Sequence, residues 1–132
     1  MTPNLSSALS ALETAAERLR LIEAQAREAL FAQNDPATYR QKLEEKTMLL
    51  MELPELIEPF CDGLGRQALR ELRAGVDSFA LRAERAMELS SLFFMNCLLY
   101  PEDYKEGEPN DLEVFIERLR ARHSSGHRKE AE

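Results

Sequence analysis

The sequence predicts an all-α protein, an antiparallel bundle of three long helices followed by a short C-terminal helix. Ala, Leu, Glu, Arg and Lys make up 73 of the 132 residues, a share that is typical of long helices. Val, Ile and Thr, which strands tend to favour, contribute only 9 residues. Three stretches repeat apolar residues at helical spacing, and turn residues separate them. The length is that of one domain, which we place at residues 1–122, with a disordered polar tail at 123–132.

The first predicted helix covers about residues 4–33. Its apolar residues alternate between spacings of four and three and then continue after one irregular step, which predicts a narrow packing stripe in a bundle. The turn residues Asn34, Asp35 and Pro36 follow. Because Asp35 can accept hydrogen bonds from free amides and Pro36 needs no amide in a first turn, a second helix should begin here. The stripe consists of Leu5, Leu9, Leu12, Ala16, Leu19, Ile22, Ala26 and Leu30.

The second predicted helix ends before a turn at Asp62, Gly63, Leu64 and Gly65. Pro54 lies within it and removes a backbone donor, so we expect a kink or a break near that residue. Its apolar side carries Tyr39, Leu43, Leu50, Leu53 and Ile57.

The third predicted helix, about residues 66–99, should be the longest. Residues 35–62 have a net charge of −4 and residues 63–100 a net charge of +1, which favours antiparallel packing of the second helix on the third. A regular three-four repeat places Phe93 on the core stripe and Phe94 off it. The stripe consists of Leu69, Leu72, Val76, Phe79, Ala83, Ala86, Ser90, Phe93 and Cys97.

A polar loop should follow at residues 100–111, because three proline or glycine residues in it oppose a helix. Asn110 or Asp111 can cap a short last helix, and Glu113 has the spacing of a capping box with Asn110. The apolar stripe of this helix is Leu112, Phe115, Ile116 and Leu119.

The sequence offers no set of residues for catalysis, a cofactor or a metal ion, so we expect a protein that is not an enzyme. Both histidines, His123 and His127, fall in the predicted tail, and Cys61 and Cys97 are interpreted as buried structural thiols. A net charge of −7 argues against nucleic-acid binding. No apolar run approaches the length of a membrane span, and the first residues do not have the pattern of a secretory signal. We therefore expect a cytoplasmic protein.

Residues 89–100 are apolar on all sides of the predicted third helix, more than one packing face can bury. Either the last helix folds back over this end, or a partner segment covers it after the last helix moves aside as a lid. The second interpretation predicts a partner-binding surface made of Leu92, Phe94, Met95, Leu98, Leu99, Leu112, Phe115, Ile116 and Leu119.

Several short stretches resemble FlgN-type flagellar export chaperones, which are small, acidic helical proteins. The resemblance covers about residues 5–107. Pro54 and the pair Arg82 and Arg85 depart from the family pattern, which favours asparagine about where the two arginines stand. The similar stretches are Ala32 to Asp35, Leu43 to Lys46, Leu49 with Leu50 and Leu53, Phe93 with Phe94, Leu98 with Leu99, and Tyr104 to Gly107.

The resemblance implies a cytoplasmic chaperone that binds a C-terminal helical segment of flagellar hook-associated proteins before their secretion. It also implies that the C-terminal part of the chaperone makes the contacts. The alternative is a structural coiled-coil or scaffold protein without a client, which would be a homodimer. Sedimentation separates these two classes, because an obligate dimer persists at low concentration.

Overall fold

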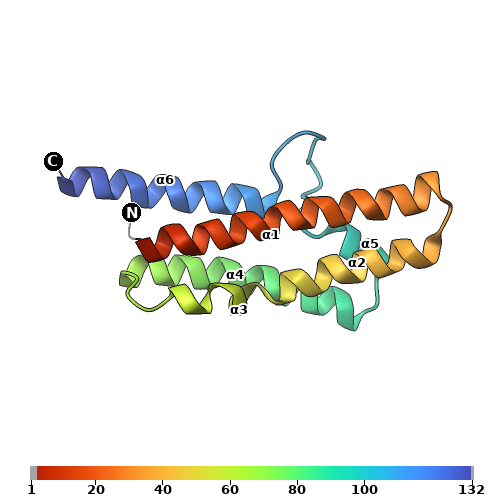
Figure 1. The fold of residues 1–132 in the computed structure, drawn as a ribbon, viewed down its shortest axis with the longest axis horizontal. Coiled ribbons are helices and arrows are strands. Elements are labelled where there is room, and N and C mark those ends of the chain that lie inside the picture. The colour runs from red at the N-terminus through yellow and green to blue at the C-terminus, as the bar shows by residue number, and fades with distance from the viewer. Residues whose placement is uncertain (1–2, 132) are drawn as a thin grey trace.

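The computed structural model describes residues 3–131, with side chains for residues 4–123. The protein is all-α, and the part described contains no strand. Long helices α1 (Pro3–Arg27), α2 (Pro36–Met51) and α4 (Arg66–Glu88) pack together with the C-terminal helix α6 (Asp111–Ala131), as Figure 1 shows. The predicted all-α class is therefore confirmed, whereas the expected lengths of the third and the last helix differ from the structure.

The connection between α1 and α2 forms as the sequence predicts. A π-helical turn, Glu28–Ala32, ends the first helix, and Asn34 adopts a φ of 50° where the chain reverses. The Asp35 carboxylate then accepts hydrogen bonds from the amide and the hydroxyl of Thr38, at 3.1 and 2.6 Å. Pro36 occupies the first turn of α2. The cap and the proline together define where the second helix begins.

The second predicted helix is broken at Pro54, again as the sequence indicates. Helix α2 ends at Met51, and the short helix α3 (Leu53–Ile57) and a 3₁₀ turn (Glu58–Phe60) continue in the same general direction. Gly63 then adopts a φ of +87°, which a residue with a side chain rarely tolerates, and α4 begins after this turn.

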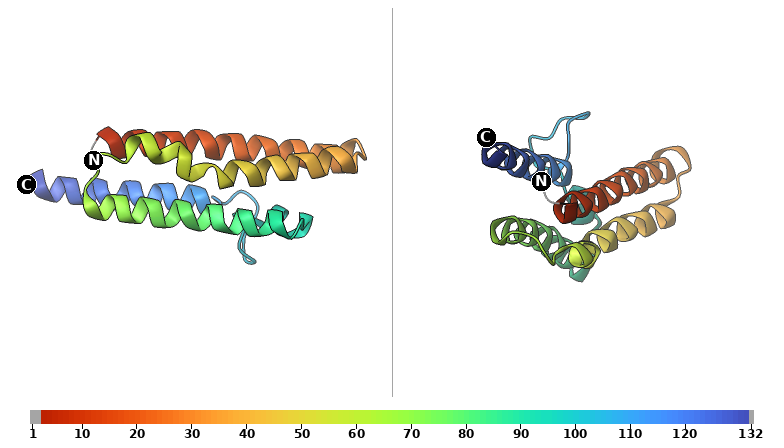
Figure 2. Two further views of the ribbon diagram at one scale, coloured as in Figure 1. Left: turned by 90° about the horizontal axis from the view of Figure 1, so that it is seen from below. Right: turned by 60° about the vertical axis from the view of Figure 1, so that its left-hand side comes forward.

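Helix α6 packs on α1 and on the N-terminal part of α4, antiparallel to α4. The ring of Phe115 lies edge-on against Phe79 at 5.6 Å between centroids, and a Cβ on Gly75 would lie 2.1 Å from Cε1 of Phe115. About two turns farther along α6 than Phe115, Arg122 pairs with Glu71 at 2.9 Å. Figure 2 shows that α6 runs beside the start of α4 and not beside its end.

The predicted third helix is shorter than expected, because it stops at Glu88. Ser90 has a φ of 50°, and the hydroxyl of Ser91 accepts a hydrogen bond from the Phe94 amide at 3.1 Å. This cap begins a separate helix, α5 (Leu92–Cys97), so α1 with 25 residues is longer than α4 with 23. The prediction of one continuous helix to Leu99 is therefore wrong.

The predicted capping box at the start of α6 is present in both directions. The Asn110 amide donates to Glu113 at 2.8 Å, and the Glu113 amide donates to the Asn110 side chain at 3.0 Å. The helix is longer than expected, since its backbone stays helical to Ala131. Most of the predicted tail, the side chains of residues 124–131 and residue 132, lies outside the described residues, so its lack of packing stays a prediction.

The core has two parts. The larger joins α1, α3, α4 and α6 along most of the molecule, and the first helix contributes the predicted stripe from Leu5 to Leu19. The smaller lies where the ends of α1 and α4, the middle of α2 and α5 meet, and consists of Ala26, Leu43, Ala86 and Met95. This smaller core holds α5 in place.

Candidate functional site

Two adjacent phenylalanines project from the short helix α5. Phe93 is 71% exposed and Phe94 is 49% exposed, and their ring centroids are 5.7 Å apart. Leu89, at the end of α4, is 64% exposed beside them in the chain. Scattered exposed leucines are ordinary, but a contiguous group of large apolar side chains on a soluble protein marks an interaction site. We call Leu89, Phe93 and Phe94 the α5 patch.

Local sequence explains why the two rings face outward. The Ser91 cap starts α5 in a new direction, and Met95 then turns into the smaller core, where it is fully buried. Positions one and two residues before a buried anchor point away from it on a helix. The interpretation of Phe93 as a core residue is therefore wrong, because the three-four repeat of apolar residues does not mark one face across a break in the helix. Two consecutive serines before an apolar run are the cap signal that could have revealed this break.

The nine residues predicted to bind a partner separate into two groups in the structure. Phe94 is exposed, and the other eight are buried or half-buried. Leu92 and Leu98 are half-buried and pack against the smaller core. The other six belong to the packed interior or lie against it: Met95, Leu99, Leu112, Phe115, Ile116 and Leu119.

The last helix packs with only the final residues of the apolar segment 89–100, from Leu98 onward. Its apolar side chains pack into the larger core with α1 and the start of α4. Residues of α2 and α4 make the main contacts with α5, and Leu99, just after α5, packs in the same core as Leu112 of α6. The expectation that α6 folds back over the apolar segment is therefore wrong for Leu89, Phe93 and Phe94, and the α5 patch is left uncovered within the described chain.

Grooves lie on both sides of Phe94. One, of about 610 Å³, lies between α5 and the hairpin of α1 and α2, and Phe93, Tyr39 and Arg27 line it. The other, of about 510 Å³, lies between α5 and the end of α4, and Arg82 and Arg85 line it. Phe94 and Cys97 belong to both. We call the second one the α4–α5 groove.

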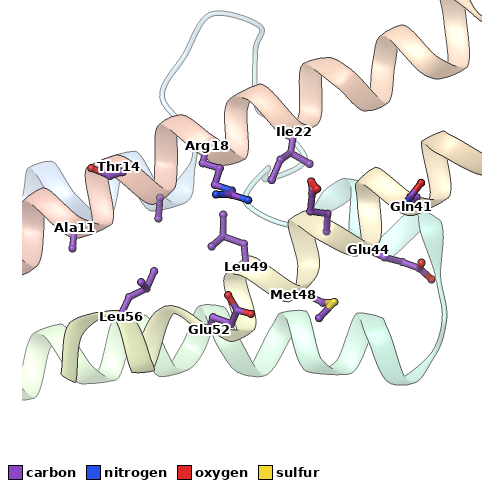
Figure 3. A pocket seen from close by; sticks show the side chains of 12 residues that line it. Ala11, Thr14, Arg18, Ile22, Gln41, Glu44, Met48, Leu49, Glu52 and Leu56 are labelled. Atoms are coloured by element: carbon purple, nitrogen blue, oxygen red, sulfur yellow. The ribbon is translucent and has the colours of Figure 1, made fainter. Parts of the chain in front are cut away.

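A third groove, of about 640 Å³, runs between α1 and α2, away from α5 (Figure 3). Met48, which is 53% exposed, and Leu49 and Leu56 form its apolar side. Glu44 and Glu52 lie along it and make it acidic. It has no exposed aromatic ring, so the α5 patch is the better candidate for a site that anchors a partner.

Arg20 binds the loop after α5 to the bundle. Arg20 of α1 donates two hydrogen bonds to the Glu113 carboxylate, at 3.1 and 2.7 Å, and a third to the carbonyl of Glu108 at 3.1 Å. The Tyr104 hydroxyl donates to the same carbonyl at 2.6 Å. The hydrogen bond with Arg20 holds the pKa of Glu113 below its usual value, and the same contact raises the pKa of Arg20. The loop is therefore held against α1 rather than left free.

A buried ion pair fastens α5 itself. Lys46 of α2 is only 1% exposed and lies 3.0 Å from the carboxylate of Glu23, which is also buried. The Lys46 ammonium also donates a hydrogen bond to the carbonyl of Asn96 in α5, at 3.2 Å. The Tyr100 hydroxyl donates to Glu23, and the ammonium lies 5.1 Å from the centre of the Tyr100 ring. One lysine thus connects α1, α2, α5 and the loop.

Burial shifts the ionisation of this cluster. It lowers the pKa of Lys46, with Glu23 acting in the opposite direction, and it raises the pKa of Tyr100, as does the hydrogen bond to Glu23. Lys46 lines neither groove, and Tyr100, which lines both, has its hydroxyl hydrogen-bonded to Glu23, so we interpret the cluster as support for α5. One feature of the sequence indicates that Lys46 is buried. It lies three residues after Leu43 and four before Leu50, on the apolar side of its helix.

The burial of the two cysteines and the surroundings of His123 agree with expectation only in part. Cys61 is buried as predicted, and burial raises the pKa of its thiol. Cys97 is exposed, and the expectation that it is buried is wrong because α5 turns that side outward. His123 is not in a solvated tail, since its Nε2 lies 3.2 Å from Glu71; the side chain of His127 lies outside the described residues.

Among the described residues, no group of three or more His, Cys, Asp or Glu side chains is placed to hold a metal ion. No helix in the same part of the chain is both long enough and apolar enough to cross a membrane. No family model, curated protein or solved structure matches the chain.

Proposed function

We propose that this protein binds an amphipathic helical segment of a partner protein at the α5 patch. Helix-in-groove recognition needs apolar anchors with grooves beside them. The observation that carries the proposal is the pair of exposed phenylalanines, Phe93 and Phe94, on a helix whose far side is firmly buried. Holding such rings in place before binding reduces the entropy lost on association.

The proposed partner is a C-terminal helical segment of a flagellar hook-associated protein, and the proposed role is export chaperone. The support is the resemblance to FlgN-type chaperones, which implies contacts in the C-terminal part of the chain. The role is binding rather than catalysis, and it takes place in the cytoplasm. The α5 patch lies within that part, and its definition rests on the exposure of its side chains, independently of the resemblance.

The alternative proposal is a homodimeric scaffold in which a second copy covers the α5 patch. The same exposed rings support it, because a two-fold interface would bury Phe93 and Phe94 of one copy against the same two residues of the other copy. Sedimentation at micromolar and lower concentrations distinguishes the two. A monomer favours the chaperone, whereas a dimer that Phe94→Ala dissociates favours the scaffold.

Calorimetric titration with the C-terminal fragment of a hook-associated protein from the same organism tests the chaperone proposal. Truncating an anchor costs about 2 kcal/mol or more of binding free energy, so Phe94→Ala should raise the Kd at least about 30-fold. The matched control is Phe31→Ala, which removes an even more exposed ring, 81% accessible, from the π-helical turn after α1; Phe31 lines neither groove beside Phe94. Equal affinities for the wild type and both variants would contradict the proposal.

A further inference from the structure

The α4–α5 groove continues the path that α6 follows on α4. Helix α6 packs on the face of α4 that carries Glu71 and Phe79, and it begins only at Asp111. Steps of three and seven residues from Phe79 along the same helix lead to Arg82 and Ala86, at the groove. Figure 2 shows that α6 does not extend over this end of α4. A second helix could therefore lie on α4 beyond the start of α6.

The floor of the groove is apolar and one wall is positively charged. Leu89, Phe94 and Leu98 supply the apolar contacts, and Arg82 and Arg85 lie one turn apart on α4. Both arginines are exposed, and none of the ion pairs found among residues 4–123 uses either of them. Their charges are thus available to a ligand in the groove.

The negative charges of the same helix lie elsewhere. Glu71 lies three turns before Arg82 and pairs with Arg122 of α6. At 100° per residue, Asp77, Glu84 and Glu88 fall about 120° or more around α4 from Arg82, although Glu88 is only one turn from Arg85. None of the three lines the groove, and Asp111 is the one acidic residue that does. The chain carries a net charge of −7, so this groove is a locally positive site on an acidic protein.

We propose that the α4–α5 groove binds an acidic amphipathic helix of the partner protein. Its apolar side would contact Leu89, Phe94 and Leu98, and its Asp or Glu side chains would pair with Arg82 and Arg85. This inference rests on the proposed helix-binding function and adds the chemistry of the segment that is bound. Arginine suits such contacts because its planar fork pairs with both oxygens of a carboxylate.

The charge preference is opposite to the one that the whole molecule would give. A protein of charge −7 attracts cationic peptides at long range. At physiological salt the screening length is about 8 Å, so contacts within the groove decide the affinity of the bound state. A preference for an acidic peptide would therefore report the two arginines and not the net charge.

The experiment uses two labelled 20-residue helical peptides with the same leucine positions, one with Glu and one with Lys at the polar positions. Fluorescence anisotropy at physiological salt measures the Kd of each for the full chain. We expect the Glu peptide to bind about tenfold more tightly than the Lys peptide. The double variant Arg82→Glu/Arg85→Glu should abolish or reverse this preference.

The matched control is Arg66→Glu/Arg70→Glu, which makes the same change of charge at the other end of α4, where both arginines are exposed. It should leave the preference in place, and thermal melting checks that both double variants fold. A Lys peptide that binds as tightly as the Glu peptide or more tightly would overturn the inference. If Phe94→Ala then still weakens both peptides, the proposed function stands. If Phe94→Ala weakens neither, or neither peptide binds, the proposed function fails as well.

Discussion

Lys46 shows how a single buried charge organises the region around the α5 patch. Its ammonium contacts Glu23 of α1 and the Asn96 carbonyl of α5, with Tyr100 beside it. A buried charge is tolerated only when it is paired and hydrogen-bonded, because removal from water costs several kcal/mol per ion. The orientation of α5, and with it of the proposed partner-binding α5 patch, thus depends on the buried cluster of Lys46, Glu23 and Tyr100.

Lys46→Met should lower the free energy of unfolding by about 3–5 kcal/mol, because it leaves the Glu23 carboxylate buried without a counter-charge. Lys42→Met is the matched control, since Lys42 of the same helix forms only a surface pair with Glu45 at 3.6 Å. Urea denaturation measures both. Lys46→Met combined with Glu23→Gln should recover much of the loss, since no charge is then buried. Equal effects of the two single lysine variants would show that the pair is not buried in solution.

Acid should weaken the attachment of the loop through Glu113. Arg20 lowers the pKa of Glu113 in the folded protein. The contribution of the carboxylate to stability is therefore present above the unfolded pKa of about 4.3 and is lost as the pH falls through the folded pKa. Glu113→Gln should therefore lower the melting temperature at pH 7 and have a smaller effect at pH 3. A deficit of the same size at both pH values would contradict the assigned role of the ionised carboxylate.

At the scale of single residues, the sequence predicted local interactions and not distant ones. The Asp35 cap and the Asn110 and Glu113 capping box were predicted because both partners lie within three residues of each other. The pairing of Lys46 with Glu23 depends on how two helices pack, which no spacing along the chain specifies.

At the scale of helices, the break between α4 and α5 determines what is exposed. The three-four repeat continues from Phe79 through Ala86 to Phe93, but the chain leaves the helix at Leu89 and restarts at Ser91. Periodicity reports a face only while the helix is continuous. The break at Pro54 was predicted from a covalent property of proline, whereas the break at Ser90 needs a φ of 50° that the sequence does not demand.

The contact between α4 and α6 can be tested at Gly75. Alanine is ordinarily better than glycine in a helix by about 1 kcal/mol, but here its Cβ would lie 2.1 Å from the ring of Phe115. Gly75→Ala should therefore destabilise the protein by about 1–3 kcal/mol, as overpacking does. In a Phe115→Ala background the same change should be neutral or stabilising. Thermal or urea unfolding of the four proteins gives the answer, and stabilisation by Gly75→Ala in both backgrounds would mean that α6 does not pack here.

At the scale of the whole molecule, the bundle was predictable and the position of its last helix was not. Composition excluded a sheet, and turn residues at Asn34 to Pro36 and at Gly63 divided the chain into antiparallel segments. The apolar side of α6 could have packed on α5 or on α1 and α4, because the loop between α5 and α6 is long enough for either. The structure has the second arrangement, which leaves the α5 patch uncovered within the described chain.

This arrangement also changes the proposed mechanism of binding. A movable last helix is not needed to expose the patch, because α6 does not lie on it. Eight of the nine residues that the sequence assigned to the partner surface pack into the core or against it. The proposed function therefore depends on Phe93 and Phe94, together with the grooves beside Phe94.

The most direct test of the central proposal is the reactivity of Cys97. This thiol is exposed and lines both grooves beside Phe94, whereas Cys61 is buried and its raised pKa slows its reaction. The rate of alkylation of Cys97 is measured by mass spectrometry, with and without a saturating C-terminal fragment of a hook-associated protein. If the partner helix lies on the α5 patch, its binding should slow the alkylation of Cys97 at least tenfold and leave Cys61 unaffected. An unchanged rate at Cys97 in the saturated complex would contradict the proposal.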